Sequence, residues 1–274
     1  MALSLFLQSL VNGLNQGAIY ALIALGYTMV YGIIRMINFA HGDFIMVGSY
    51  TLFYTVPLMI AAGMPAWLAV FAAIAVCVAV GVIVETVAYK PVRQAGSMSA
   101  LITALAMSVF LENLAMVLFG ASPKSVSAIF TLPTFQFLGA TLQIKYLLTL
   151  GIGLAMMAGL QIFVKKTRLG KAMRAVPQDK EASVLVGINV NRIITITFAI
   201  GSGLAAVAAL MYCSTYPRCT MDMGSMMGLK AFIAAVLGGI GIIPGAMLGG
   251  LLVGLIEIFV KVYIAPGWYE AITY

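Results

Sequence analysis

Long apolar runs separated by short polar segments make up most of this 274-residue chain. A helix needs roughly 20 apolar residues to cross the hydrocarbon core of a bilayer. Six runs approach or exceed that length, at about residues 5–32, 44–62, 66–89, 99–120, 146–164 and 193–211. The pattern therefore predicts an all-α, polytopic bundle of transmembrane helices.

Two further apolar runs, at about residues 229–243 and 245–264, meet at a turn formed by Ile243, Pro244 and Gly245. The first run has only about 15 residues and carries glycines near its end. It is therefore a short span, a broken helix or a re-entrant segment, and the last two are tolerated only where protein buries them. Counting both runs, we expect about eight membrane segments.

Composition supports a membrane protein. Hydrophobic residues make up 63% of the chain and charged residues only 8%, and the mean hydropathy is +1.09. A soluble domain of this length could not cover its surface with so few charges. The net charge of +7 does not indicate a nucleic-acid partner, because seven of the 15 Lys and Arg residues fall in residues 165–192.

These basic residues also predict the orientation of the chain. Short loops rich in Lys and Arg stay on the cytoplasmic side of a membrane protein. The basic segments 90–93 and 165–192 lie two spans apart, so both can face the cytoplasm. The N-terminus then lies outside and Arg35 lies near the inner face. We expect a multi-pass protein of the plasma (inner) membrane.

Residues 165–192 contain the pattern of a short helix outside the bilayer. Pro177 precedes it, Asp179 and Glu181 occupy its first turn, and Gly187 ends it, as the helix dipole and a left-handed C-terminal cap favour. Its apolar positions are Ala182, Val184, Leu185 and Ile188. We interpret it as a docking element for a partner; the alternative is a basic connector that only marks the inner side.

Two groups of polar residues are candidates for a transport pathway. Asn12, Asn15 and Gln16 lie on the first span, where polar side chains should face the protein interior. Asn38, His41 and Asp43 lie between the first two runs. They form either a broken helix that lines a pathway or a turn in which Gly42 bends the chain and the Asp43 carboxylate caps the next helix.

Motifs for bond chemistry are absent from the sequence. It contains no phosphate-binding loop, no dinucleotide fingerprint, no metal-spaced His and Cys cluster and no nucleophile elbow. We therefore expect neither an enzyme nor a bound cofactor or metal. Glu112 is the best candidate for a buried acid and keeps open a stand-alone, ion-coupled secondary transporter, whereas Glu85 and Glu257 lie near basic residues, Glu257 one turn from Lys261. A membrane scaffold that recruits a soluble partner is a further alternative, and pairing of Cys213 with Cys219 is also open.

Several segments in chain order resemble one family, the branched-chain amino-acid ABC transporter permeases. The resemblance is carried by residues 26–44 (GYTMVYGIIRMINFAHGDF), 89–93 (YKPVR), 181–189 (EASVLVGIN), 228–232 (GLKAF) and 238–246 (GGIGIIPGA). These segments are spread along most of the chain. The chain is most similar to the smaller of the two permease subunits in such systems.

The resemblance implies a heteromeric importer of leucine, isoleucine, valine or related hydrophobic amino acids. Its partners would be a second permease subunit, two cytoplasmic ATPase subunits that bind the ATP, and an extracytoplasmic amino-acid-binding protein. Segment 165–192 would be the cytoplasmic coupling loop, whose helix inserts into an ATPase groove. The coupling residues would be Asp179, Glu181, Ala182, Val184, Leu185, Gly187 and Ile188. Related permeases carry urea or short-chain amides, which is the alternative substrate class.

Two departures from the family pattern stand out. Family members usually continue for a further apolar span, so we expect a single permease domain over residues 1–274 that is truncated at its C-terminus. Residues 216–223 are also more polar and richer in Met than the family pattern suggests. If this stretch meets the binding protein, the preference for partner or substrate differs.

Overall fold

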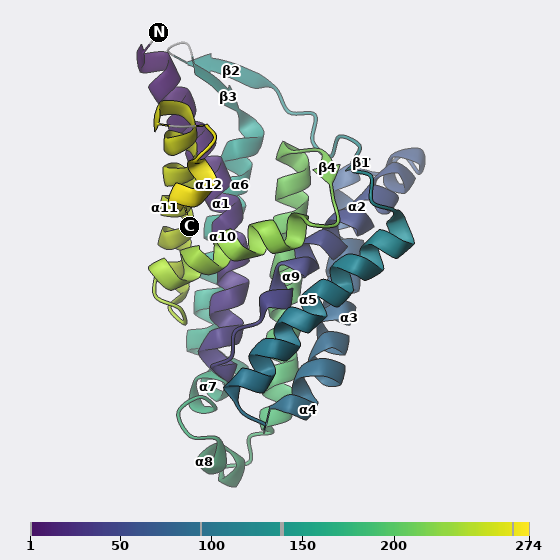
Figure 1. Cartoon of the computed structure of the whole chain (residues 1–274), viewed down its shortest axis with the longest axis vertical. Helices are drawn as coiled ribbons and strands as arrows, with labels where there is room; N and C mark the ends of the chain where they lie inside the picture. Colours follow the sequence, from purple (N-terminus) through teal and green to yellow (C-terminus); the bar gives the residue numbers. More distant parts are fainter. Residues whose placement is uncertain (1, 94, 138–139, 265, 274) are drawn as a thin grey trace.

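A computed structural model describes residues 2–93, 95–137, 140–264 and 266–273, and it forms the helical bundle that the apolar runs predict (Figure 1). Within these residues, seven helical segments are long and apolar enough to cross a membrane. The α-helices of these segments are α1 (Ala2–Ile34), α2 (Asp43–Ala61), α3 (Ala69–Val84), α5 (Ser97–Phe119), α6 (Ile144–Lys166), α9 (Val190–Thr215) and α11 (Ile243–Phe259). The prediction of an all-α, polytopic bundle is confirmed.

Shorter helices extend or connect these spans. They are the 3₁₀ turns η1 (Phe39–His41) and η2 (Ala66–Leu68), the π turns η3 (Glu85–Tyr89) and η4 (Val260–Ile264), and α4 (Lys90–Val92), α7 (Arg168–Ala175), α8 (Lys180–Leu185), α10 (Met223–Leu237) and α12 (Tyr269–Thr273). The expected basic loop at 90–93 is wrong in part, because the helix continues to Val92. Lys90 and Pro91 directly follow the π turn η3, and the helical segment ends one residue later at Val92.

Two small antiparallel sheets lie at the end of the molecule that carries the N-terminus (Figure 1). The hairpin of β2 (Thr134–Phe137) and β3 (Ala140–Gln143) pairs Thr134 with Gln143. β1 (Lys124–Ser125) pairs with β4 (Arg218–Cys219) in the register Lys124 to Cys219. The predicted connection at 121–145 therefore contains strands that the apolar pattern does not reveal.

α4, α7 and α8 lie at the end opposite the N-terminus (Figure 1). We call it the basic end, because it carries Arg93 and the basic segment 165–192. The two basic segments, 90–93 and 165–192, thus lie at one end of the molecule and the N-terminus at the other, as their spacing along the chain predicts.

α1 forms the centre of the bundle and packs most extensively against α11. The two helices approach so closely that a Cβ atom on Gly250 would lie 2.4 Å from Ala21 Cα, and one on Gly17 would lie 2.7 Å from Leu251 Cα. Only glycine permits this backbone approach, as is common where small residues line membrane helix interfaces. The glycines of the 245–254 stretch thus have a packing role.

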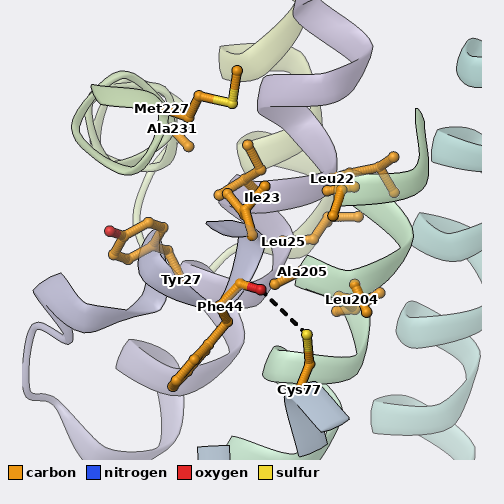
Figure 2. Packing of buried hydrophobic residues seen from close by; sticks show 14 of the residues in the cluster. Leu22, Ile23, Leu25, Tyr27, Phe44, Cys77, Leu204, Ala205, Met227 and Ala231 are labelled. Carbon is orange, nitrogen blue, oxygen red and sulfur yellow. Dashed lines mark hydrogen bonds between the residues drawn. The ribbon is translucent and has the colours of Figure 1, made fainter. Parts of the chain in front are cut away.

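The apolar core joins α1 to four other helices. Figure 2 shows Ile23 and Tyr27 of α1 beside Phe44 of α2, with Met227 of α10 above them. The Cys77 thiol of α3 donates a hydrogen bond to the Phe44 carbonyl oxygen at 3.2 Å. α9 and α10 pack directly against α1, whereas α2 and α3 join the core mainly by packing against α9 and against each other.

α10 runs across the long axis of the bundle, whereas most of the long helices run more nearly along it and α5 lies obliquely (Figure 1). Its 15 residues rise only about 22 Å, at 1.5 Å per residue, less than the roughly 30 Å of a bilayer core. Among the three expected alternatives, the short span is disfavoured, because α10 is not one of the helices long enough to cross a membrane. A broken or re-entrant segment agrees with its length and direction.

The turn after α10 lies at residues 238–242, so the expected turn at 243–245 is wrong. Gly239 and Gly241 have φ angles of +88° and +96°, a backbone conformation that favours glycine. Pro244 instead stands in the first turn of α11, a position that suits proline.

Candidate functional site

The short helix expected in segment 165–192 is present as α8 at the basic end. Asp179 is its N-cap, and its Oδ1 accepts a hydrogen bond from the Ala182 N–H at 2.9 Å. The Ser183 hydroxyl donates to the Asp179 carbonyl oxygen at 2.6 Å. Gly187 follows the helix with a φ of +86°, which is the left-handed stop that the sequence predicts.

The tip of α8 exposes three consecutive large apolar side chains. Val184 is 59% exposed, Leu185 87% and Val186 76%. Asp179, Glu181, Ala182 and Gly187 are also exposed, and Ile188 is half-buried. An apolar cluster presented on a capped helix is typical of a surface that another protein covers. Val186 is the member of this cluster that the helical pattern missed, because it follows the last helical residue.

Capped helices bracket α8 on both sides. α7 was not anticipated, although Thr167 is a recognisable capping residue whose hydroxyl accepts a hydrogen bond from the Gly170 N–H at 2.9 Å. Asn189 caps α9 in the same way, accepting from the Arg192 N–H at 3.0 Å. The segment is therefore not an irregular connector but three short-linked helices.

A buried ion pair between Glu85 of η3 and Arg93, which follows α4, is hydrogen-bonded to the start of α9 beside this segment. Arg93 pairs with Glu85, which is fully buried. The Thr195 hydroxyl donates to Glu85 Oε2 at 2.7 Å, and Arg93 donates to Asn191 Oδ1 at 2.9 Å. The expected neutralisation of Glu85 by the basic segment is thus observed. Burial lowers the pKa of Arg93, but guanidinium groups start high enough to stay charged at neutral pH.

Asn12, Asn15 and Gln16 of α1 border two adjoining cavities. The smaller, of about 210 Å³, is lined by Gln16; the larger, of about 480 Å³, is lined by Asn12 and Asn15. Both cavities share Tyr216, Ile258 and Lys261 as lining residues. We call the two together the Lys261 cavities. Asn15 and Gln16 are buried, as expected for polar residues that face the interior of a membrane bundle.

Asn38, His41 and Asp43 lie at the break between α1 and α2, and all three are buried. The Tyr89 hydroxyl donates to Asn38 Oδ1 at 2.6 Å, and the His41 ring lies edge-on to Tyr27, 4.7 Å between centroids. None of the three lines the two cavities that Asn12, Asn15 and Gln16 border. The structure therefore does not bring the two predicted pathway groups together in one cavity.

The expected capping role of Asp43 is wrong. α2 begins at Asp43 itself, and no side chain caps it. The carboxyl group instead faces Ser108 and Glu112 of α5 and lies against Gly224, where an added Cβ atom would come within 2.6 Å of Asp43 Oδ1. The tight packing around the break explains this, because it directs the side chain away from the α2 N-terminus.

Sequence reasoning missed a buried ion pair beside the Lys261 cavities. Lys230 Nζ of α10 lies 2.7 Å from Glu257 Oε1 of α11, and the Tyr20 hydroxyl donates to Glu257 Oε2 at 2.7 Å. The expectation that Glu257 belongs with Lys261, one turn away, is therefore wrong. Lys230 was the available signal, since it is the single charge in the run 229–243.

A second cavity region lies toward the basic end, on the other side of the core. Its volume is about 310 Å³, and its lining includes Thr28, Arg35, Pro177 and Gly241. Between it and the Lys261 cavities, residues 21–25 of α1 are fully buried. Within the described part of this chain, α1 is thus flanked by cavities toward both ends and closed between them.

Glu112 was the sequence-predicted candidate for a buried acid. It is half-buried on α5.

Cys213 and Cys219 are buried free thiols, so the open question of their pairing is answered against a disulfide. Burial raises the pKa of Cys219 to about 11 and that of the Tyr216 hydroxyl to about 12. Both groups are therefore protonated at neutral pH, and Tyr216 keeps a hydrogen to donate in the Lys261 cavities.

Comparison with known proteins gives a consistent result. Residues 9–274 match the family described as branched-chain amino acid transport system / permease component. The chain is 45% identical to the high-affinity branched-chain amino acid transport system permease protein BraD of Pseudomonas aeruginosa, over 93% of this chain and 86% of that protein. It is 40% identical to the corresponding LivH protein of Escherichia coli K12, over 98% and 90% of the two chains.

A more distant relative is the ribose import permease protein RbsC of Escherichia coli K12, 26% identical over 97% of this chain. No solved structure matches the chain significantly. The extent of the family match and the identity to BraD and LivH lead to one conclusion: this chain belongs to the permease-component family of branched-chain amino acid transport systems.

Proposed function

We propose that this chain is a permease subunit of an ATP-driven importer that carries leucine, isoleucine, valine or related hydrophobic amino acids across the plasma membrane. The names of BraD and LivH, both permease proteins of branched-chain amino acid transport systems, support this substrate class. In this proposal the chain is a transport subunit and not an enzyme. ATP binds to partner subunits, and this chain holds no cofactor.

The exposed tip of α8 is the observation that carries the proposal. A rigid, capped helix that presents Val184, Leu185 and Val186 to solvent is suited to insertion in a groove of another protein. Each end of the segment continues into a membrane helix, α6 or α9. A movement imposed on α8 would therefore reach the bundle as a rigid-body displacement.

The orientation follows from charge. With the basic end in the cytoplasm, α8 would meet one of two ATPase subunits. The opposite end would then receive amino acid from an extracytoplasmic binding protein. A second permease subunit would complete the pathway beside this chain. The coupling residues that we propose are Asp179, Glu181, Ala182, Val184, Leu185, Gly187 and Ile188.

Co-purification tests the docking directly. We would isolate this chain from membranes with untagged neighbouring subunits, in the wild type and in a variant with Val184→Asp and Leu185→Asp. The variant removes exposed apolar contacts and leaves the spans intact, so the ATPase should be lost from it. Leu169→Asp, at an exposed apolar position of α7 in the same segment, is the matched control and should retain the ATPase.

The outcomes separate the proposal from its alternatives. An ATPase subunit that remains bound to the double variant would contradict docking through α8. An ion-coupled secondary transporter would use Glu112, which faces Asp43, and its uptake would need no ATPase and would disappear in Glu112→Gln. A urea or amide permease would show uptake of urea that leucine does not compete for.

A further inference from the structure

The Lys261 cavities contain an arrangement of charges that the packing of the bundle does not require. Lys230 and Glu257 form an ion pair with side chains only 8% and 9% exposed, and ionisable groups inside a membrane bundle often mark a transport pathway. Both residues line the smaller cavity together with Tyr20 and Gln16. The pair is therefore placed at a wall where a ligand could reach it.

Lys261 adds a second positive charge to these cavities. It lines both of them, and it lies over the Tyr269 ring with Nζ 5.1 Å from the ring centroid. Among the described residues Lys261 forms no ion pair. Its ammonium group therefore has no carboxylate partner among these residues, and it can bind an anionic group such as a carboxylate while it contacts the Tyr269 ring.

Two buried amides supply acceptors that no protein group uses. Asn15 Oδ1 and Gln16 Oε1 have no hydrogen-bond donor within the described residues, although both residues are at least 93% buried, with exposed fractions of 3% and 7%. A buried acceptor without a donor is unfavourable. Because a half-turn of an amide interchanges its oxygen and nitrogen, either group can face a ligand. A ligand that donates hydrogen bonds would satisfy them.

Apart from Asn12, the remaining lining is apolar or aromatic. The side chains of Met226, Met227, Ile258 and Val262 border the two cavities. Their volumes of about 210 and 480 Å³ compare with roughly 300–1,000 Å³ for ordinary small-molecule sites. A small molecule with both charges at one end and an apolar group at the other fits this distribution.

We propose that the Lys261 cavities bind the zwitterionic end of an α-amino acid during translocation. Lys261 holds the carboxylate, and the oxygens of Asn15, Gln16 and Glu257 surround the ammonium group. The apolar side chain lies against Ile258 and Val262. This site rests on the proposed function, because it assigns the substrate of that importer a place within this subunit.

The test measures leucine transported per ATP hydrolysed by the intact importer in proteoliposomes, with its binding protein supplied outside. Lys261→Met and Asn15→Leu should each lower this ratio at least about tenfold, as loss of a hydrogen bond to a charged group predicts. Lys261→Arg, which keeps the charge, should restore transport. Asn113→Leu makes the same change at an exposed position on α5 and should leave the ratio unchanged.

A structural role for these side chains predicts a different result. Within the described residues Asn15 Oδ1 has no donor, so Asn15→Leu should not reduce the assembly or thermal stability of the importer. Lys261→Met removes the contact with the Tyr269 ring, which is worth about 0.5–1 kcal/mol at an exposed site, so it should lower the stability only slightly. Wild-type ratios in both Lys261→Met and Asn15→Leu would overturn the site while leaving the proposed function intact. Absence of leucine uptake by the wild-type importer would remove the proposed function, and the site with it.

Discussion

Gly187 ends α8 in a left-handed backbone conformation. Its φ of +86° is a conformation that costs other residues about 1–2 kcal/mol. No atom lies within 4 Å of the place where its Cβ would stand, so the chain itself leaves room for a side chain. Within this chain the position is therefore constrained by its backbone conformation and not by packing.

We expect Gly187→Val to reduce leucine uptake by roughly tenfold, the ratio that about 1.4 kcal/mol represents. The β-branched residue disfavours the left-handed turn that orients the tip of α8. Gly187→Asn should retain most uptake, because Asn tolerates that conformation. Uptake by right-side-out vesicles measures both variants, and equal loss in the two would argue against a conformational role.

Cys219 is a residue whose chemistry follows from burial. The thiolate is the reactive form of cysteine, and burial raises the pKa of this thiol to about 11 from an ordinary value of about 8.5. At pH 8 the thiolate fraction is therefore lower than that of a free cysteine by on the order of a hundredfold.

Alkylation of the folded importer with iodoacetamide should accordingly leave Cys219 nearly unmodified at pH 8. Labelling should increase as the pH rises toward 11, because deprotonation then becomes favourable. Mass spectrometry of the labelled peptide measures this, with the denatured chain as the control for full reactivity. Rapid labelling of native Cys219 at pH 8 would contradict its burial.

At the scale of elements, the α1–α11 contact is the principal contact of the bundle. A side chain at Gly250 would overlap the backbone of Ala21, and overlap with backbone cannot be relieved by a change of rotamer. Gly159 of α6 has no atom within 4 Å of its Cβ position. The two glycines thus form a matched pair of a packed and an open site.

Gly250→Leu should lower the apparent melting temperature of the detergent-solubilised importer by several degrees. Overpacking of a tight interface costs about 1–3 kcal/mol or more, and each kcal/mol corresponds to roughly 2–4 °C in a chain of this size class. Gly159→Leu should change it little. A similar melting temperature for both variants would show that the helices do not approach as closely as described.

Sequence pattern anticipates elements that depend on local chemistry. The apolar runs predict the long helices, and Asp179 with Gly187 predicts α8, because capping and hydrophobic length are properties of neighbouring residues. The transverse direction of α10 and the pairing of Lys230 with Glu257 were not predicted. Both depend on how distant segments pack. For the ion pair, distance along the chain is misleading, because Lys261 is nearer than Lys230 to Glu257 in the sequence.

The candidate site also has features that the sequence predicts and features that only the tertiary structure reveals. Asn15 and Gln16 were expected to face the interior, and they do, because polar groups on a buried membrane helix have few other choices. Their meeting with Tyr216 and Lys261 in one region required the tertiary structure. Asn38 and His41, predicted from the same polarity argument, instead bond or pack within the core.

At the scale of the whole molecule, cavities toward the two ends are separated by the fully buried middle of α1. This is the arrangement expected of a transport subunit that opens to one side at a time. The α8 tip, the Glu85–Arg93 pair and the cavity lined by Arg35 all lie toward the basic end. In the proposed orientation, with the basic end in the cytoplasm, a partner that moves α8 would therefore act on the end where the route opens for release.

The measurement that tests this account most directly is leucine uptake by proteoliposomes containing the complete importer, with its binding protein outside and ATP inside. We predict accumulation of leucine that requires ATP hydrolysis, persists when ionophores collapse the ion gradients, and is not reduced by excess urea. Uptake by this chain alone that needs an ion gradient but no ATP would contradict the account. Such a result would indicate that transport depends on Glu112 and an ion gradient, and not on docking of an ATPase through α8.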